Sequence, residues 1–133
     1  MKKIISLLSL TFLLLTISSC KKVEYSKAHI GVWYMDKFTE NGSDRTNFFN
    51  TNFPNYSVTF NKDHSFSEHT TILGLKINVS GTWKIKGMSD KLVLKTTLPT
   101  SSTRSFDMKK LTATEFYGKL VQSANKQEYF LKR

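Results

Sequence analysis

The clearest pattern in the chain is an alternation of apolar and polar residues between Lys76 and Lys86. Every odd-numbered position of this segment is apolar or glycine, and every even-numbered position is polar. A period of two indicates a β-strand with one dry face and one wet face, whereas a helix would scatter the same residues around its circumference. The segment therefore predicts an antiparallel strand that covers a core on one side.

Shorter versions of the same pattern recur about every 10 residues along the chain. We predict eight strands, over residues 29–40, 56–60, 66–73, 76–86, 92–94, 106–108, 116–120 and 129–131. No convincing amphipathic helix separates them, which argues against a βαβ sheet. Consecutive antiparallel strands of this number most simply close into an up-and-down β-barrel, because closure removes the exposed edges. A two-sheet sandwich is the alternative that periodicity leaves open.

Three connections differ in character. Residues 61–64 have the composition of a tight hairpin turn, and residues 98–105 are predicted to form a loop. The connection over 39–55 is longer than the ~12–15 residues usual for a structureless loop in a compact domain, which favours a functional role. It carries Phe48, Phe49 and Phe53 in an otherwise polar stretch.

Aromatic residues supply the ligand-binding candidates of this sequence. They are Trp83, Phe48, Phe49, Phe53 and Tyr56. The competing interpretation of the three phenylalanines is a satellite cluster that packs back onto the barrel. For Trp83, and more strongly for Trp33, it is a place in the ordinary core.

The amino-terminal residues have the features of a secretory signal. Two lysines follow Met1, and a largely apolar run of 14 residues extends from Ile4 to Ile17. That run is shorter than the ~20 residues of a permanent membrane span. A basic start, a short apolar core and small residues before a break predict a signal that is removed.

The only cysteine of the chain, Cys20, follows Ile17-Ser18-Ser19. This segment resembles the bacterial lipobox, which implies that Cys20 is lipidated after cleavage before it. The alternative is an ordinary signal with an incidental cysteine. We therefore divide the chain into a signal peptide (1–19), a lipidated tether (20–29) and a barrel domain (30–133). A single cysteine also excludes an internal disulfide and a cysteine-based zinc site.

Charge and motifs exclude several classes of function. The formal charge is +10, or +8 without Lys2 and Lys3. An exported lipoprotein seldom meets nucleic acid, so we expect no nucleic-acid partner and interpret the strand lysines as a solvated face. The chain has no GxSxG, HExxH or phosphate-binding glycine loop, and its three histidines suggest no metal site. We therefore expect neither an enzyme nor a cofactor.

Two tripeptides, Gly31-Val32-Trp33 and Gly81-Thr82-Trp83, stand in predicted strands. A GxW motif in the first strand of an eight-stranded barrel resembles the lipocalin and wider calycin pattern. The chain from about residue 29 to 133 looks like the lipocalin-like domains of lipoproteins from Bacteroidetes-type bacteria. It lacks the TDY segment and the disulfides of animal lipocalins, so ligand identity is not transferred from them.

The resemblance implies roles for particular residues. Trp33, with Gly31, would close the base of the barrel, and Lys132 or Arg133 would cap its indole through a cation–π contact. The 39–55 loop would form a lid over the open mouth. The function expected is the binding of a small, mostly apolar ligand by a monomer. The alternative is an interaction module with a filled barrel that engages an envelope partner through its loops or basic face.

The residues after Cys20 bear on location. Lys21 and Lys22 follow it, and no acidic pair is present there. Acidic residues at this place are what surface-export signals in these bacteria look like. We therefore expect an envelope protein on the periplasmic face of the outer membrane, with exposure on the cell surface as the alternative.

Overall fold

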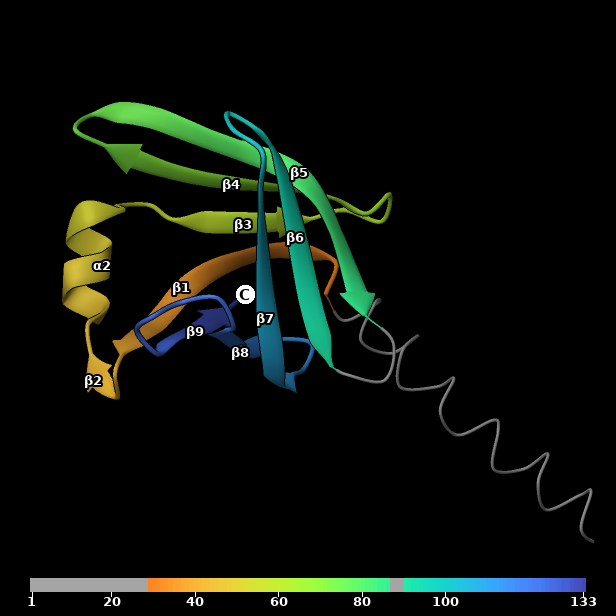
Figure 1. Cartoon of the computed structure of the whole chain (residues 1–133). Helices are drawn as coiled ribbons and strands as arrows, with labels where there is room; N and C mark the ends of the chain where they lie inside the picture. Colours follow the sequence, from red (N-terminus) through yellow and green to blue (C-terminus); the bar gives the residue numbers. More distant parts are fainter. Residues whose placement is uncertain (1–28, 87–89) are drawn as a thin grey trace, which may run out of the picture.

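The computed structural model describes residues 29–86 and 90–133, so the predicted signal, Cys20 and most of the predicted tether lie outside the described residues. The described chain forms one antiparallel sheet and one short helix (Figure 1). In order, the elements are β1 (Gly31–Glu40), β2 (Ser43–Asp44), α2 (Thr46–Asn52), β3 (Ser57–Phe60), β4 (Ser65–Ile72), β5 (Leu75–Lys86), β6 (Lys91–Leu98), β7 (Ser102–Leu111), β8 (Glu115–Leu120) and β9 (Gln127–Lys132).

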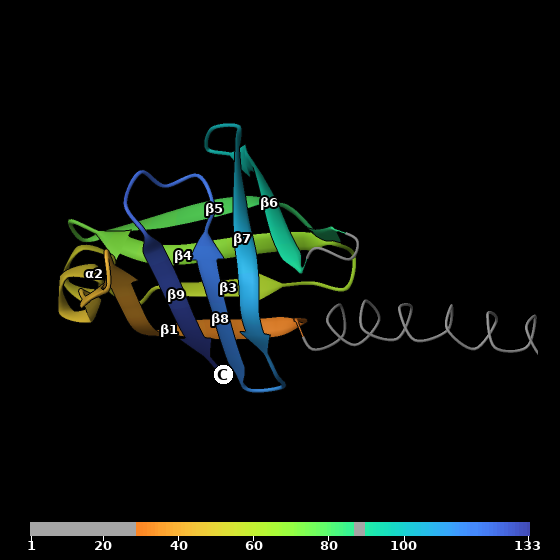
Figure 2. The same cartoon turned by 60° about the horizontal axis from the view of Figure 1, so that its bottom comes forward.

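The sheet closes on itself. From β3 to β9 each strand pairs antiparallel with the next, and β1 pairs with both β3 and β9. Figure 2 shows how β7, β8 and β9 cross in front of β1 and β3 on the way back to β1. The eight-stranded antiparallel barrel is thus confirmed, and the two-sheet alternative is excluded. The two-residue strand β2 is only a hairpin extension of β1.

The structure corrects two predicted loops. In the first, β7 begins at Ser102, so residues 102–105 belong to a strand and pair with β6. This segment, Ser-Thr-Arg-Ser, has no apolar residue to give the alternation, yet its backbone completes the ladder. In the second, residues 39–55 contain the end of β1, β2 and α2 instead of irregular chain. Helix α2 buries only Phe49, which leaves too weak a periodicity to predict it.

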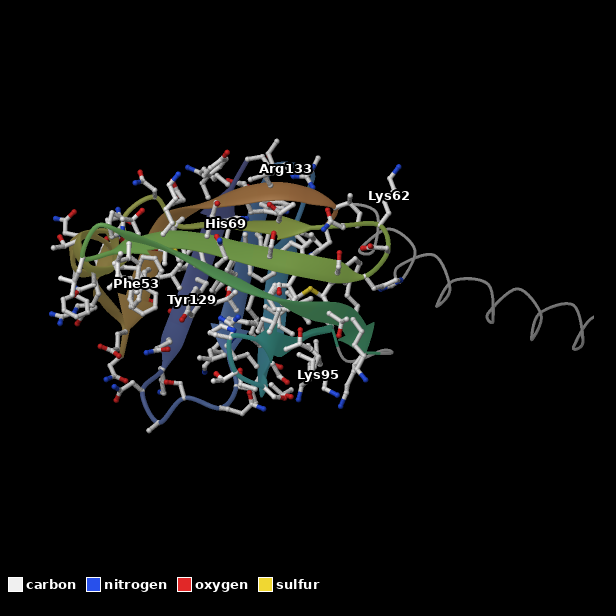
Figure 3. All side chains as sticks on the ribbon, turned by 90° about the horizontal axis from the view of Figure 1, so that it is seen from above. Phe53, Lys62, His69, Lys95, Tyr129 and Arg133 are labelled. Carbon is white, nitrogen blue, oxygen red and sulfur yellow. The ribbon has the colours of Figure 1, made fainter. Side chains whose placement is uncertain are left out.

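The barrel has a closed end, which we call the base, and an open end, which we call the mouth. The base carries the start of β1 and the β3–β4 turn, whereas α2 and the β4–β5 turn stand at the mouth (Figure 1). Figure 3 shows Phe53 and Tyr129 toward the mouth and Lys62, in the β3–β4 turn, at the far end. No helix among the described residues is long and apolar enough to cross a membrane.

An aromatic cluster fills the base. Trp33 is fully buried, and its indole Nε1 donates a hydrogen bond to the His29 carbonyl at 2.9 Å. The Arg133 guanidinium carbon lies 4.4 Å from the centre of the Trp33 ring. At Gly31, where φ is +129°, an added β-carbon would lie 3.2 Å from Arg133 Cζ, so only glycine suits this place. His29, assigned above to the tether, packs inside this cluster and is 1% exposed.

Candidate functional site

A cavity of about 250 Å³ opens at the mouth of the barrel. Its walls come from α2, the segment between α2 and β3, and strands β4, β5, β7 and β9, and they are apolar around a small polar group. The lining residues are Phe49, Phe53, Tyr56, Glu68, Thr70, Ile72, Ile77, Val79, Arg104 and Tyr129. A concave, mainly apolar site with a few convergent polar groups is the usual form of a small-molecule site.

Helix α2 supplies the lid side of this cavity. Phe49 is 6% exposed, and its ring centre lies 5.1 Å from that of Phe38 on β1 and 5.3 Å from that of Tyr56. Phe53 follows at 5.0 Å from Phe49 and keeps 37% of its surface exposed. Thr71 N–H donates to the Pro54 carbonyl at 3.0 Å, which ties the end of the helical segment to β4. The lid is therefore packed against the barrel.

A partly buried ion pair forms the floor of the cavity. Arg104 Nη2 on β7 donates to Glu68 Oε2 on β4 at 2.6 Å, and the Tyr56 hydroxyl donates to Glu68 Oε1 at 2.7 Å. The Glu68 side chain is 10% exposed and that of Arg104 is 30% exposed. Both carboxylate oxygens thus have a donor, which is what allows a charged group to be buried inside a barrel.

The environment fixes the protonation of this floor. Burial, followed by the nearby charge of Glu68, raises the pKa of Tyr56 well above its ordinary value. Burial also raises the pKa of Tyr129. For Arg104, burial opposes the charged form, but the hydrogen bond and charge of Glu68 outweigh it and raise the pKa. At neutral pH the floor consists of two neutral phenols and one guanidinium–carboxylate pair.

Beneath the floor the interior is nearly full. Side chains from β3, β6, β7, β8 and β9 leave a void of only about 20 Å³. This is close to the volume of a single water-sized sphere. A ligand can therefore occupy the mouth half of the barrel, while the base half acts as ordinary core.

The structure separates the five predicted ligand-binding residues. Phe49, Phe53 and Tyr56 line the cavity. Phe48 is on the outer side of α2, 53% exposed, with the Arg45 guanidinium 4.8 Å from its ring centre. Trp83 does not line the cavity: it is 3% exposed at the base, where its Nε1 donates to the Asn61 carbonyl at 3.1 Å.

The sequence reasoning missed Glu68, Arg104 and Tyr129. A signal for two of them exists in the strand parity, because Glu68 shares its face with Phe66, and Arg104 shares its face with Phe106. A charged residue on the dry face of a strand is unusual, and two such residues of opposite sign predict an internal pair. Tyr129 gave no such signal, since an aromatic residue on the core-facing side of a strand is expected in any hydrophobic core.

The closed barrel agrees with the comparison to known proteins. A family model described as a lipocalin-like domain matches residues 30–117 of the 133-residue chain. No curated protein matches the chain significantly. The matched region runs from the start of β1 into β8, and the remaining residues supply β9, which closes the barrel onto β1. The chain therefore belongs to the lipocalin-like domain family.

Proposed function

We propose that this protein is a lipid-anchored, cell-envelope lipocalin-like domain that binds a small, mostly apolar ligand in the mouth cavity. The observation that carries the proposal is the cavity of about 250 Å³, with apolar walls above a polar floor. A cavity of ~150 Å³ holds benzene, so this one suits a ligand, or part of one, of roughly 10 non-hydrogen atoms. Binding a molecule of this kind needs no catalytic group.

Filling the cavity tests the ligand site directly. Ile77 lies on the cavity wall in β5, whereas its neighbour Lys76 is exposed. We expect Ile77→Trp to abolish saturable binding of an apolar fluorescent probe, and the matched Lys76→Trp variant to bind like the wild type. Envelope lipid extract should displace the probe from the wild type. Equal binding by both variants, or no saturable binding by the wild type, contradicts a mouth site.

The anchor is a separate part of the proposal and rests on the sequence around Cys20, which lies outside the described residues. Two acyl chains hold a protein stably at a bilayer, whereas a single chain gives only marginal binding. We expect Cys20→Ala to release the protein from the membrane fraction and to remove its acyl mass, with Ser18→Ala as the control. A Cys20→Ala protein that stays in the membrane, and a wild type without acyl mass, contradict the anchor. Lys21 and Lys22 support the periplasmic face of the outer membrane; protease protection in intact cells tests that face.

An interaction module is the second candidate. Large apolar side chains stand exposed near the mouth: Phe48 is 53% exposed, Leu73 97% and Leu75 67%. Exposed apolar groups gathered at one end of a domain favour contact with a protein or membrane partner. If this candidate is correct, Leu73→Ser with Leu75→Ser will weaken partner capture while probe binding stays unchanged.

A further inference from the structure

The mouth cavity carries no net formal charge. Among its lining residues the only ionised side chains at neutral pH are Glu68 and Arg104, and they pair with each other at 2.6 Å. Tyr56 stays neutral and is already committed as a donor to Glu68. A charged ligand head would therefore find no uncompensated partner on the floor. Burying such a charge without a partner is strongly unfavourable.

Hydrogen-bond donors nevertheless remain on the floor. A guanidinium has five N–H groups, and within residues 29–86 and 90–133 Arg104 uses one of them, for Glu68. Tyr129 also lines the cavity, and its hydroxyl makes no hydrogen bond to another described residue. Each Glu68 oxygen, by contrast, has already accepted one donor and keeps only one lone pair, against four N–H groups left on Arg104. The groups left for a ligand are thus mainly donors, held beneath apolar walls.

We infer that the ligand is an uncharged carbonyl compound, with a ketone, ester or amide oxygen held by Arg104 and Tyr129 and a short apolar body between α2 and β5. This inference rests on the proposed function and names its ligand class. A carbonyl oxygen is an acceptor without a proton or a charge, so it complements the remaining donors and leaves the Glu68–Arg104 pair intact. A carboxylate would compete with Glu68 for the guanidinium, and an ammonium would meet the guanidinium charge.

The test uses probes of nearly equal size that differ in the head: 2-nonanone, octanamide, octanoate and octylammonium. Each is titrated calorimetrically at pH 7.4 into the full chain in zwitterionic nanodiscs, with empty nanodiscs as the blank. We expect the two carbonyl probes to bind at least tenfold more tightly than both ions. Octanoate or octylammonium binding as tightly as the carbonyl probes overturns the inference but leaves the proposed function standing. Saturable binding by none of the four defeats both.

A charge variant adds an internal control. Glu68→Gln preserves the size of the side chain and leaves Arg104 as an uncompensated cation. We expect this variant to gain at least tenfold in affinity for octanoate relative to 2-nonanone, whereas Lys76→Gln, on the exposed face, leaves the order unchanged. An unaltered order in a folded Glu68→Gln variant overturns the inference. If that variant does not fold, the wild-type order of the four probes decides alone.

Discussion

His29 makes the stability of the base depend on pH. Its imidazole is 1% exposed and is surrounded by the rings of Trp33, Phe60, Trp83 and Phe116. Neither ring nitrogen has a hydrogen-bond partner within residues 29–86 and 90–133. Burial, and next the charge of Arg133, lowers the pKa of His29 from 6.5 to about 3. The folded barrel therefore keeps this ring neutral under conditions where the unfolded chain protonates it.

The size of the effect follows from proton linkage. Between pH 6.5 and about 3 the unfolded chain binds a proton at His29 that the folded chain does not bind. The free energy of unfolding therefore falls as the pH falls through this window, by about 1.4 kcal/mol per pH unit. Lowering the pH from 7 to 5 should cost about 2 kcal/mol from this residue alone.

Urea unfolding of the full chain, followed by tryptophan fluorescence, measures this loss, because both tryptophans lie in the base beside His29. Hydrogen bonds lower the pKa values of carboxylates such as Asp63 and Glu128, so protonation of these groups in acid also destabilises the fold. The His29→Leu variant separates them. It should lose about 2 kcal/mol less than the wild type between pH 7 and 5. It should also be more stable at pH 7 by about 1 to 3 kcal/mol, because two unsatisfied buried nitrogens are removed. Identical pH slopes for the two proteins would refute the reasoning.

Two further predictions concern backbone contact and the internal ion pair. A β-carbon added at Gly81 would lie 2.0 Å from the Lys95 carbonyl oxygen, so Gly81→Ala must shift β5 from β6. Urea unfolding should show a loss of about 1 to 3 kcal/mol, and a loss no larger than that of Ser80→Ala would contradict this contact. Arg104→Leu should lower the free energy of unfolding by about 3 kcal/mol, because it leaves the buried Glu68 carboxylate without its partner. The double variant with Glu68→Leu should recover most of that loss. Additive losses in the double-mutant cycle would show that the two charges are not coupled.

Alternation along the chain was sufficient to predict the antiparallel strands, as between Lys76 and Lys86, but it left a barrel and a two-sheet sandwich both open. The structure differs from the predicted loops at residues 98–105 and 39–55. There it depends on the pairing of one strand with its neighbour and on the docking of a helix against the barrel. Ser102–Ser105 is held by the β6 ladder without an apolar face, and α2 is a seven-residue helix anchored by Phe49. Neither strand pairing nor helix docking requires a strong periodicity of apolar residues in the sequence.

The residues of the candidate site were likewise only partly predictable from the sequence. Aromatic residues near the lid could be named from sequence, and Phe49, Phe53 and Tyr56 do line the cavity. Which end of the barrel Trp83 faces could not be named, because parity fixes the face of a strand but not its closed end. The Glu68–Arg104 pair joins β4 to β7 across the interior, through residues 36 positions apart.

The pairing of β1 with β9 decided that the strands close into a barrel instead of a two-sheet sandwich. The sequence by itself determined the eight short antiparallel strands, because a period of two and short turns leave few other ways to bury one face of every strand. It also supplied the Cys20 anchor as a prediction. Only the tertiary structure decided that the base is filled and the mouth hollow. That outcome depends on how side chains from strands distant in sequence share one interior, where His29, Trp33 and Trp83 occupy the base, and Arg104 and Glu68 neutralise each other below the mouth.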